Sequence, residues 1–174
     1  GISLERIAET LNHTKGVKGR SEIIDTGRDF SVICDYAHTP DGLKNILPSI
    51  KKFTKGRLIT LFGCGGNRDA GKRPIMGEVA AEYSDFLIVT SDNPRLEDPI
   101  AIINDILPGV KKHQTEYVVV PNRKEAIFYA VQHAQPDDVV VLAGKGHENY
   151  QVLGNEKVHF DEREIVREAL ATLS

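Results

Sequence analysis

The residues best suited to chemistry in this sequence lie at positions 91–95, directly after a short apolar run. An apolar run followed by polar residues predicts a strand that leads into a loop, and Pro94 ends the strand pairing because it has no N–H to donate. The Arg95 guanidinium can bind a carboxylate through two parallel hydrogen bonds, while Asp92 and Asn93 can bind an ammonium or orient the arginine. The stretch is therefore suited to recognition of a small zwitterion. The alternative is an Asx-type turn with a solvated arginine.

Polar residues also follow the other apolar runs of the chain. In a parallel sheet, loops of this kind share the carboxyl edge, which is where ligands bind in open α/β folds. The opposite connections are plain polar turns, so we expect one ligand site at the carboxyl edge. The polar loops are residues 35–41, 63–69, 92–95, 121–123 and 144–148.

The spacing of apolar residues predicts the elements that position these loops. Short, nearly continuous apolar runs that alternate with helical segments are typical of a parallel sheet covered on both faces. We expect a Rossmann-like, doubly wound α/β fold, with a mostly parallel sheet of about six strands and a C-terminal hairpin and helix. The expected strands are 21–24, 30–34, 58–62, 86–90, 117–120 and 139–142, with a hairpin at 150–152 and 157–160. The expected helices are 2–11, 39–53, 74–83, 99–107, 124–134 and 162–173.

Composition narrows the class of protein. The chain has 174 residues, 40% hydrophobic and 27% charged, with a net charge of -3, so it can fill one core and has no basic surface for nucleic acid. It contains no apolar run long enough to span a bilayer and no signal-peptide pattern, so we expect no membrane partner. We also expect a cytoplasmic protein and a monomer. Cys34 and Cys64 are read as reduced packing residues, and the histidines have no paired metal spacing. Because the chain begins with Gly1, we expect it to be part of a longer protein.

Two glycine-rich stretches approach nucleotide-binding motifs without fitting them. Residues 66–73 match GxxxxGK, but Arg73 replaces the Ser or Thr that holds Mg²⁺ in a phosphate-binding loop. Residues 63–68 begin as GxGxxG, but Arg68 replaces the third glycine, which allows close helix–strand packing. We therefore expect these glycines to let the backbone pass close to a ligand into which Arg68 reaches.

Four motifs in this order resemble the C-terminal domain of the Mur ligases: residues 35–41, 65–69, 92–95 and 144–148. The likeness covers essentially the whole chain. It is greatest to the enzymes that add meso-diaminopimelate to UDP-N-acetylmuramoyl-L-alanyl-D-glutamate in peptidoglycan biosynthesis. Residues 16–20 look like the end of that family's central domain, with Lys18 where Pro is usual. The resemblance thus implies a boundary between a linker at 1–20 and the C-terminal domain at 21–174.

The resemblance implies an amide ligase that works through an acyl phosphate. The family's phosphate-binding loop, its Mg²⁺ ligands and its carbamylated lysine belong to the central domain, and its UDP-sugar site belongs to an N-terminal domain. This chain would therefore hold neither ATP nor Mg²⁺ by itself, would contain no catalytic residue, and would be inactive alone. Its expected partners are meso-diaminopimelate, UDP-N-acetylmuramoyl-L-alanyl-D-glutamate, ATP and the missing domains of the same polypeptide.

The resemblance also implies roles for individual residues. Arg20 resembles the residue that reaches the ATP phosphates, and Asp35 resembles the acid that hydrogen-bonds the ribose. His38 either lines the nucleotide site or caps the helix that starts near position 39, and Glu148 either contacts the ligand or is a solvated residue at a helix start. Lys145 and His147 stay unassigned. The residues implied to bind meso-diaminopimelate are Arg68, Asp92, Asn93, Pro94, Arg95, Gly144 and Glu148.

Two alternatives remain open from the sequence. One is a related Mur-type domain, from a lysine-adding ligase or from a folylpolyglutamate or cyanophycin synthetase. Diaminopimelate differs from lysine by a distal carboxylate, so a lysine-adding relative would leave Arg95 facing no anion, at a cost of about 1–3 kcal/mol if the charge is desolvated. Arg95 therefore favours diaminopimelate. The other alternative is a freestanding nucleotide-binding module.

Overall fold

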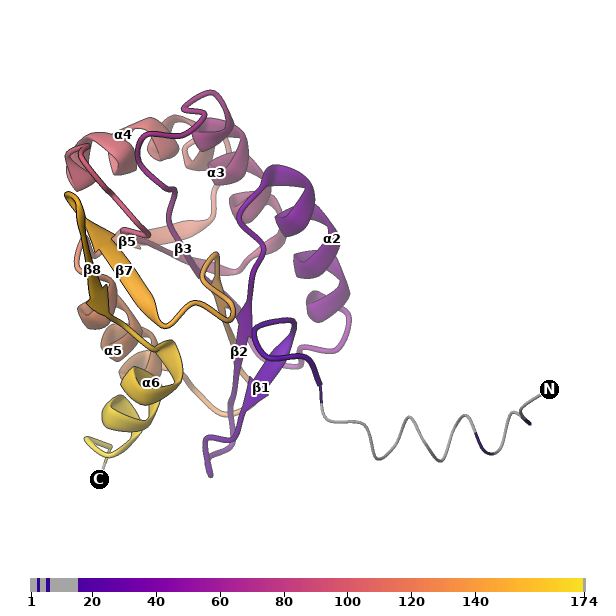
Figure 1. Cartoon of the computed structure of the whole chain (residues 1–174). Coiled ribbons are helices and arrows are strands. Elements are labelled where there is room, and N and C mark those ends of the chain that lie inside the picture. The colour runs from indigo at the N-terminus through magenta and orange to yellow at the C-terminus, as the bar shows by residue number, and fades with distance from the viewer. Residues whose placement is uncertain (1–2, 4–5, 7–15, 174) are drawn as a thin grey trace.

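A six-stranded sheet forms the centre of this computed structural model, which describes Ser3, Arg6 and residues 16–173. The strands lie in the order β1-β2-β6-β3-β4-β5, and every neighbouring pair is parallel except β1 with β2 (Figure 1). A separate antiparallel hairpin, β7–β8, follows the last sheet strand. The strands are β1 (Glu22–Ile24), β2 (Ser31–Asp35), β3 (Leu58–Phe62), β4 (Phe86–Val89), β5 (Glu116–Val119), β6 (Val139–Ala143), β7 (Tyr150–Leu153) and β8 (Glu156–His159).

Helices cover both faces of the sheet because its central strands are apolar on both sides. In β3, Leu58 and Phe62 pack into the core under α2, α3 and α4, while Ile59 and Leu61 pack into the core on the opposite face. That opposite core also holds Ala126 of α5 and other apolar residues of α5 and α6. The helices are α2 (Pro40–Lys51), α3 (Lys72–Tyr83), α4 (Pro99–Val110), α5 (Arg123–His133) and α6 (Glu162–Leu170).

Side-chain caps fix where several helices begin. Thr39 caps α2 by accepting from the Gly42 amide, and Asn122 caps α5 by accepting from the amides of Lys124 and Glu125. Such caps satisfy amide groups that have no partner inside the helix. Because α2 and α5 both start directly after loops of the carboxyl edge, their caps also fix the positions of those loops.

The predicted fold class is confirmed, with shifts at the ends of elements. Helix α4 continues through Pro108 to Val110, beyond the predicted end at Leu107, because Ile106 and Val110 are buried in the core. The final helix ends at Leu170, earlier than predicted. The helix predicted over 2–11 lies outside the described residues, apart from positions 3 and 6. Within the part of the chain that the structure describes, no helix has both the length and the apolar character needed to cross a bilayer.

Candidate functional site

The loops that follow β2, β3, β4 and β6 meet at the carboxyl edge of the sheet and enclose a pocket of about 440 Å³. Six of the seven residues expected to bind the amino acid line it: Arg68, Asp92, Asn93, Arg95, Gly144 and Glu148. The seventh, Pro94, is buried behind the pocket wall, where its carbonyl meets Gly66. Tyr36, His38, Gly63, Cys64, Gly65, Lys72 and Tyr150 complete the lining.

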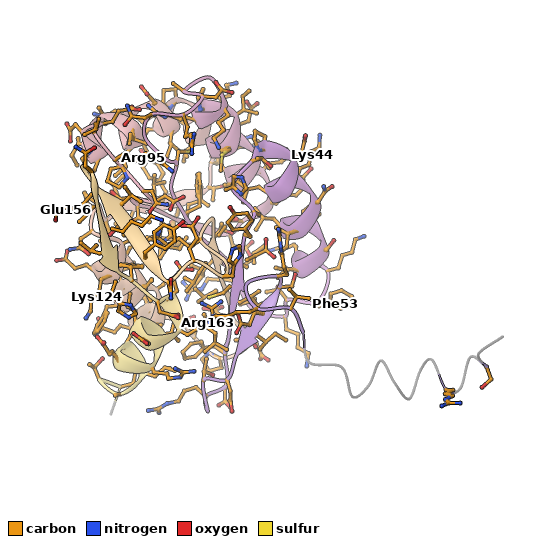
Figure 2. The ribbon with its side chains drawn as sticks, viewed as in Figure 1. Lys44, Phe53, Arg95, Lys124, Glu156 and Arg163 are labelled. Atoms are coloured by element: carbon orange, nitrogen blue, oxygen red, sulfur yellow. The ribbon has the colours of Figure 1, made fainter. Side chains whose placement is uncertain are left out.

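Arg95 is held in a left-handed backbone conformation with φ of 54°. The β7–β8 hairpin maintains it, because the Arg95 amide donates to the Val152 carbonyl at 3.1 Å and the Gly154 amide donates to the Arg95 carbonyl at 2.8 Å. Its Nη1 donates to the carbonyls of Gly66 at 2.9 Å and Asn93 at 3.3 Å. In Figure 2 the labelled Arg95 accordingly lies beside the hairpin. Arg95 is therefore half-buried and hydrogen-bonded to the protein backbone, unlike the fully solvated arginine of the alternative prediction.

Asn93 and Glu148 join the loops after β4 and β6. Asn93 Nδ2 donates to Glu148 Oε2 at 3.0 Å, and Asn93 Oδ1 accepts from the Val152 amide at 3.0 Å. Asp92 is 8% exposed and Asn93 5%, so neither is a surface turn residue. Glu148 does not start a helix, contrary to one of its two predicted roles. It lies in a turn closed by its own amide and the Lys145 carbonyl, at 2.9 Å.

The pocket carries opposite charges on different parts of its lining. Arg68, Lys72 and Arg95 are cationic, whereas Asp92 and Glu148 are anionic. A ligand with both a carboxylate and an ammonium matches this arrangement.

Lys72 was not predicted as a site residue; its Nζ donates to the His38 carbonyl at 2.8 Å. Its position as the lysine of the incomplete GxxxxGK motif could have indicated that Lys72 lies at the site.

A second pocket, of about 430 Å³, adjoins the first. All three residues predicted for the nucleotide, Arg20, Asp35 and His38, line it. Asp35 is buried, its Oδ2 accepts from the Ser21 amide at 2.7 Å, and its Oδ1 accepts from the Ala37 amide at 2.8 Å. Because an ionised carboxylate has about four acceptor sites, Asp35 can still accept from a ligand hydroxyl.

His38 is not a helix cap, since Thr39 caps α2. Its Nδ1 lies 2.8 Å from the Tyr36 carbonyl, to which it must donate, and its ring packs edge-on against Tyr36 with 4.6 Å between centroids. The Arg20 guanidinium lies over the Tyr36 ring, 4.8 Å from its centroid. Tyr36 and His38 line both pockets and thus form a shared wall.

Arg123 lies outside both pockets but binds the backbone at the ends of two strands that lead into the site, and the sequence did not predict its burial. Its Nη1 donates to the Ser91 carbonyl at 3.2 Å and its Nη2 to the Ala143 carbonyl at 2.9 Å, at the ends of β4 and β6. Its Nε donates to Glu162 Oε1 at 2.9 Å, and both side chains are fully buried. Burial raises the pKa of Glu162, and the nearby Arg123 opposes that rise. Nothing in the sequence distinguishes Arg123 from a solvated arginine at a helix start.

The glycine-rich loop after β3 has a packing role that the motif analysis did not anticipate. A Cβ at Gly66 would lie 1.9 Å from the Pro94 carbonyl oxygen, so the glycine allows two backbones to touch. Arg73, which occupies the Ser/Thr position of a phosphate-binding loop, is buried in ion pairs with Glu97 and Asp105, both at 2.8 Å. This loop therefore packs against the segment that holds Arg95 and is not a phosphate-binding loop.

Both cysteines are free and buried, as predicted for packing residues. Burial raises the pKa of the Cys64 thiol to about 12, and its Sγ lies 3.7 Å from Met76 Sδ. Burial likewise raises the pKa of Cys34. Among the residues that the structure describes, there is no group of three or more His, Cys, Asp or Glu side chains that could hold a metal ion.

Comparison with known proteins identifies the family. Residues 19–146 match the family model described as "Mur ligase, glutamate ligase domain", and this match covers most of the chain. The chain belongs to this Mur ligase family. The resemblance found in the motifs is thereby confirmed, as is the fold that it implied.

Two curated relatives of this Mur ligase chain carry closely related names. The UDP-N-acetylmuramoyl-L-alanyl-D-glutamate--2,6-diaminopimelate ligase of Caldanaerobacter subterraneus subsp. tengcongensis is 57% identical over 171 residues, which are 98% of this chain and 35% of the relative. Ligase 1 of the same name from Clostridium acetobutylicum is 56% identical over 99% of this chain and 36% of its own length. The chain thus spans about a third of the length of these relatives.

A solved structure supports the same relationship. It is a UDP-N-acetylmuramoyl-L-alanyl-D-glutamate--2,6-diaminopimelate ligase that is 38% identical, with a TM-score of 0.85. The superposition covers 98% of this chain and 35% of that protein. The sheet, the hairpin and the final helix described here therefore belong to a fold found in an enzyme with that name.

Proposed function

We propose that this chain is the amino-acid-binding part of an ATP-dependent ligase that adds meso-diaminopimelate to UDP-N-acetylmuramoyl-L-alanyl-D-glutamate in peptidoglycan biosynthesis. The observation that carries the proposal is that Arg68, Arg95 and Glu148, from three separate loops, line one pocket. The names of the similar proteins support it as well. In this proposal residues 21–174 are one domain, 1–20 are the linker, and the remaining domains of a longer cytoplasmic, monomeric polypeptide complete the active site.

In the amino-acid pocket, Arg68 and Arg95 bind the carboxylate of the distal head group of diaminopimelate. Asp92 and Glu148 accept hydrogen bonds from its ammonium, and hydrogen bonds to charged groups of this kind contribute about 1.5–3 kcal/mol each. Asn93 orients Glu148 by donating to its carboxylate. Pro94 stiffens the backbone between these side chains. Gly144, with φ of 118°, allows the chain to turn at the pocket floor, where a Cβ would lie 3.4 Å from Asp92 Oδ2. Each predicted residue thus has a physical role.

In the neighbouring pocket, Arg20, Asp35 and His38 bind the nucleotide. Asp35 accepts from ribose hydroxyls with the lone pairs that the Ser21 and Ala37 amides leave available. Arg20 is exposed at the entrance, where its guanidinium can reach phosphate oxygens. ATP supplies the phosphoryl group that activates the D-glutamate carboxylate as an acyl phosphate. The described residues include no metal-ligand group, so in this proposal Mg²⁺ is held by the rest of the polypeptide.

The contribution of this chain to the reaction is positioning. The proximal amine of diaminopimelate attacks the carbonyl carbon of the acyl phosphate; the amide bond forms, the bond to phosphate breaks, and inorganic phosphate leaves as the amine loses a proton. Holding the amine next to the acyl phosphate makes this bimolecular step effectively intramolecular. Such positioning can remove roughly 7–11 kcal/mol from a barrier when the geometry is good. The shared wall of Tyr36 and His38 supports this role, because it makes the amino-acid and nucleotide pockets neighbours. Closure of the other domains over both pockets would exclude water from the reacting atoms.

Calorimetric titration of the 174-residue chain with meso-diaminopimelate and with L-lysine tests this proposal. We expect diaminopimelate to bind at least about tenfold more tightly, because lysine lacks the carboxylate that pairs with Arg68 and Arg95. Equal affinities, or tighter binding of lysine, would favour a lysine-adding relative. Micromolar binding of ATP without any binding of diaminopimelate would instead favour a nucleotide-binding module.

Turnover provides a second test. With ATP, Mg²⁺ and both substrates, we expect no amide formation by this chain alone, because the proposed phosphate cradle lies in other domains. Product detected by mass spectrometry in this assay would contradict the proposed division of labour.

A further inference from the structure

We propose that Lys145 is a positioning residue of the amino-acid pocket. Its buried ammonium holds Asn93 and balances the charges of Asp92 and Glu148, so that these three side chains face the ligand. The inference rests on the proposed function and deepens it, because it names the group that keeps the ammonium-binding side of the pocket in order.

The Lys145 ammonium lies at the meeting point of the site loops. Nζ donates to Asn93 Oδ1 at 2.9 Å and to the Tyr150 carbonyl at 2.8 Å. It also lies 3.4 Å from Asp92 Oδ1 and 3.5 Å from Glu148 Oε2. Asn93, Asp92, Glu148 and Tyr150 all line the pocket, whereas Lys145 does not. The ammonium therefore stands behind the pocket wall and contacts its members from the protein side.

Burying the Lys145 ammonium costs free energy unless neighbouring groups compensate its charge. The Lys145 side chain is fully buried, and lysine is almost never fully buried unless it is paired. Replacing Lys145 together with its carboxylate partners by apolar side chains would often be neutral or stabilising, whereas removing the lysine alone leaves buried carboxylates without a cation. The Phe160 ring, with its centroid 5.6 Å from Nζ, provides an apolar wall that an uncharged side chain could also use. Stability alone thus gives little reason for a lysine here.

Asp92 depends on this ammonium more than Glu148 does. Asp92 Oδ1 is buried and has no hydrogen-bond partner in the described structure, so the Lys145 charge at 3.4 Å is its nearest compensation. Glu148 Oε2 already accepts from Asn93 Nδ2. Without the ammonium, two carboxylates would face the same space with no buried cation between them, and their repulsion would favour protonation or displacement. Either change would remove an anion that the ligand ammonium needs.

Lys145 also connects the ammonium side of the pocket to Arg95. Asn93 Oδ1 receives both the Lys145 ammonium and the Val152 amide, and the Val152 carbonyl in turn accepts from the Arg95 amide. One buried cation thus orders the loop after β6, the loop after β4 and the hairpin strand β7. Its removal is expected to weaken ligand binding and also to destabilise the fold, because it leaves buried carboxylate oxygens without a cation.

The test compares Lys145→Met with Lys157→Met in the 174-residue chain. Lys157 is an exposed lysine of β8, and its ammonium lies over the Tyr150 ring. We expect Lys145→Met to weaken meso-diaminopimelate binding by about 10–100-fold in calorimetry, since it leaves buried acceptors unpaired. Lys157→Met should change the affinity by no more than about twofold. Equal effects of the two substitutions would overturn the proposal.

Chemical rescue separates positioning from a general packing defect. In Lys145→Ala, millimolar propylammonium should restore much of the affinity, because it can place an ammonium at the vacated position. Tetramethylammonium carries the same charge but no N–H donor and should not restore it. Rescue by both cations or by neither would contradict a role for the hydrogen-bonded ammonium.

A measurement on the unsubstituted chain tests the inference if the variants do not fold. Meso-diaminopimelate should shift the NMR signal of the Lys145 ammonium and slow its hydrogen exchange, and an unchanged signal at saturating ligand would refute the inference. Failure of the proposed function looks different, since then the unsubstituted chain would not bind diaminopimelate at all. In that case hydrogen exchange of the Asn93 side-chain amide, measured without ligand, tests the role of Lys145: its protection should be lost in Lys145→Met and retained in Lys157→Met.

Discussion

Asn93 Nδ2 donates to Glu148 Oε2 at 3.0 Å, although 55 residues separate them in the chain. Asn93 follows β4 and Glu148 follows β6, and β3 lies between these two strands in the sheet. The bond therefore crosses above the end of β3, where the loop contains Gly63, Gly65 and Gly66. Glycines leave room for side chains from both neighbouring loops to meet. The glycine-rich loop therefore lines the site and also leaves the space in which Asn93 and Glu148 meet.

Replacing Arg95 with asparagine should reduce affinity for meso-diaminopimelate by about 10–100-fold and leave the weaker lysine binding nearly unchanged. Asparagine tolerates the left-handed backbone at this position better than most residues, so the change acts on the guanidinium. Titration of both ligands measures the effect, with Arg167→Asn on an exposed position of α6 as the control. An equal loss of affinity for both ligands would show that Arg95 does not bind the distal carboxylate.

Gly66→Ala should destabilise the fold by about 1–3 kcal/mol, because a new methyl group would overlap a neighbouring backbone. Its Cβ would lie 1.9 Å from the Pro94 carbonyl oxygen, so one of the two loops must move. Urea denaturation gives the stability, and diaminopimelate titration should reveal weaker binding by the folded variant. Gly16→Ala is the control, since nothing lies within 4 Å of a Cβ there. A neutral Gly66→Ala would mean that the two loops are not in contact.

Arg123→Met should cost about 3–5 kcal/mol of unfolding free energy, because it strands the Glu162 carboxylate in the core. Combining it with Glu162→Leu should recover most of that loss, since no charge is then left buried. The control is Lys124→Met, which breaks the exposed pair with Glu168 and should cost no more than about 1 kcal/mol. Urea denaturation of all four chains, including the unsubstituted one, measures these differences. A double variant no more stable than Arg123→Met would argue against a stranded charge as the cause of the loss.

Asp138 should make the stability depend on pH in the acid range. Burial by itself would raise the pKa of this carboxyl. Hydrogen bonds from the Arg57 side chain and from the amides of Gln135 and Arg57 outweigh that effect, so the pKa of Asp138 is lowered. A lowered pKa in the folded state stabilises the protein above the unfolded value of about 3.9, and that contribution is lost as the pH falls below it.

Asp138→Asn should therefore be destabilising at neutral pH, and its deficit relative to the unsubstituted chain should shrink at pH 3. Denaturant unfolding at both pH values measures this change. Asp137→Asn is a matched control, because Asp137 is exposed and asparagine tolerates its φ of 67°. A deficit that is constant with pH would indicate that the Asp138 charge is not what stabilises the fold.

The parts of the site that could be predicted from sequence are those that the sheet topology brings together. A parallel sheet sends every strand's following loop to one edge, so the sequence predicts that the loops with Arg68, Asp92 and Glu148 lie at that edge. The roles of these individual residues came from the family resemblance. The strand at Leu58–Phe62 was predicted with its correct bounds, because an unbroken apolar run of this length is typical of a strand buried on both faces.

The buried cations could not be predicted, because neither local pattern nor sheet topology determines whether a charged side chain is buried. Lys145 and Arg123 are residue types that usually face solvent, and local pattern gives no sign that their charged groups lie inside. Their burial depends on partners far away in the sequence, such as Asn93 for Lys145 and Glu162 for Arg123. The helix ends were missed by a few residues because burial of Val110 outweighs the local preference of Pro108 to stop a helix.

The shared wall of Tyr36 and His38 has a thermodynamic consequence. Two ligands that contact the same pair of rings are coupled, because any shift of the rings made by one changes the surface offered to the other. Linkage makes this coupling reciprocal: the factor by which the first ligand alters the affinity for the second equals the factor in the reverse direction. If, as proposed, one pocket binds the amino acid and the other binds the nucleotide, their order of binding changes the route to the ternary complex and leaves its free energy unchanged.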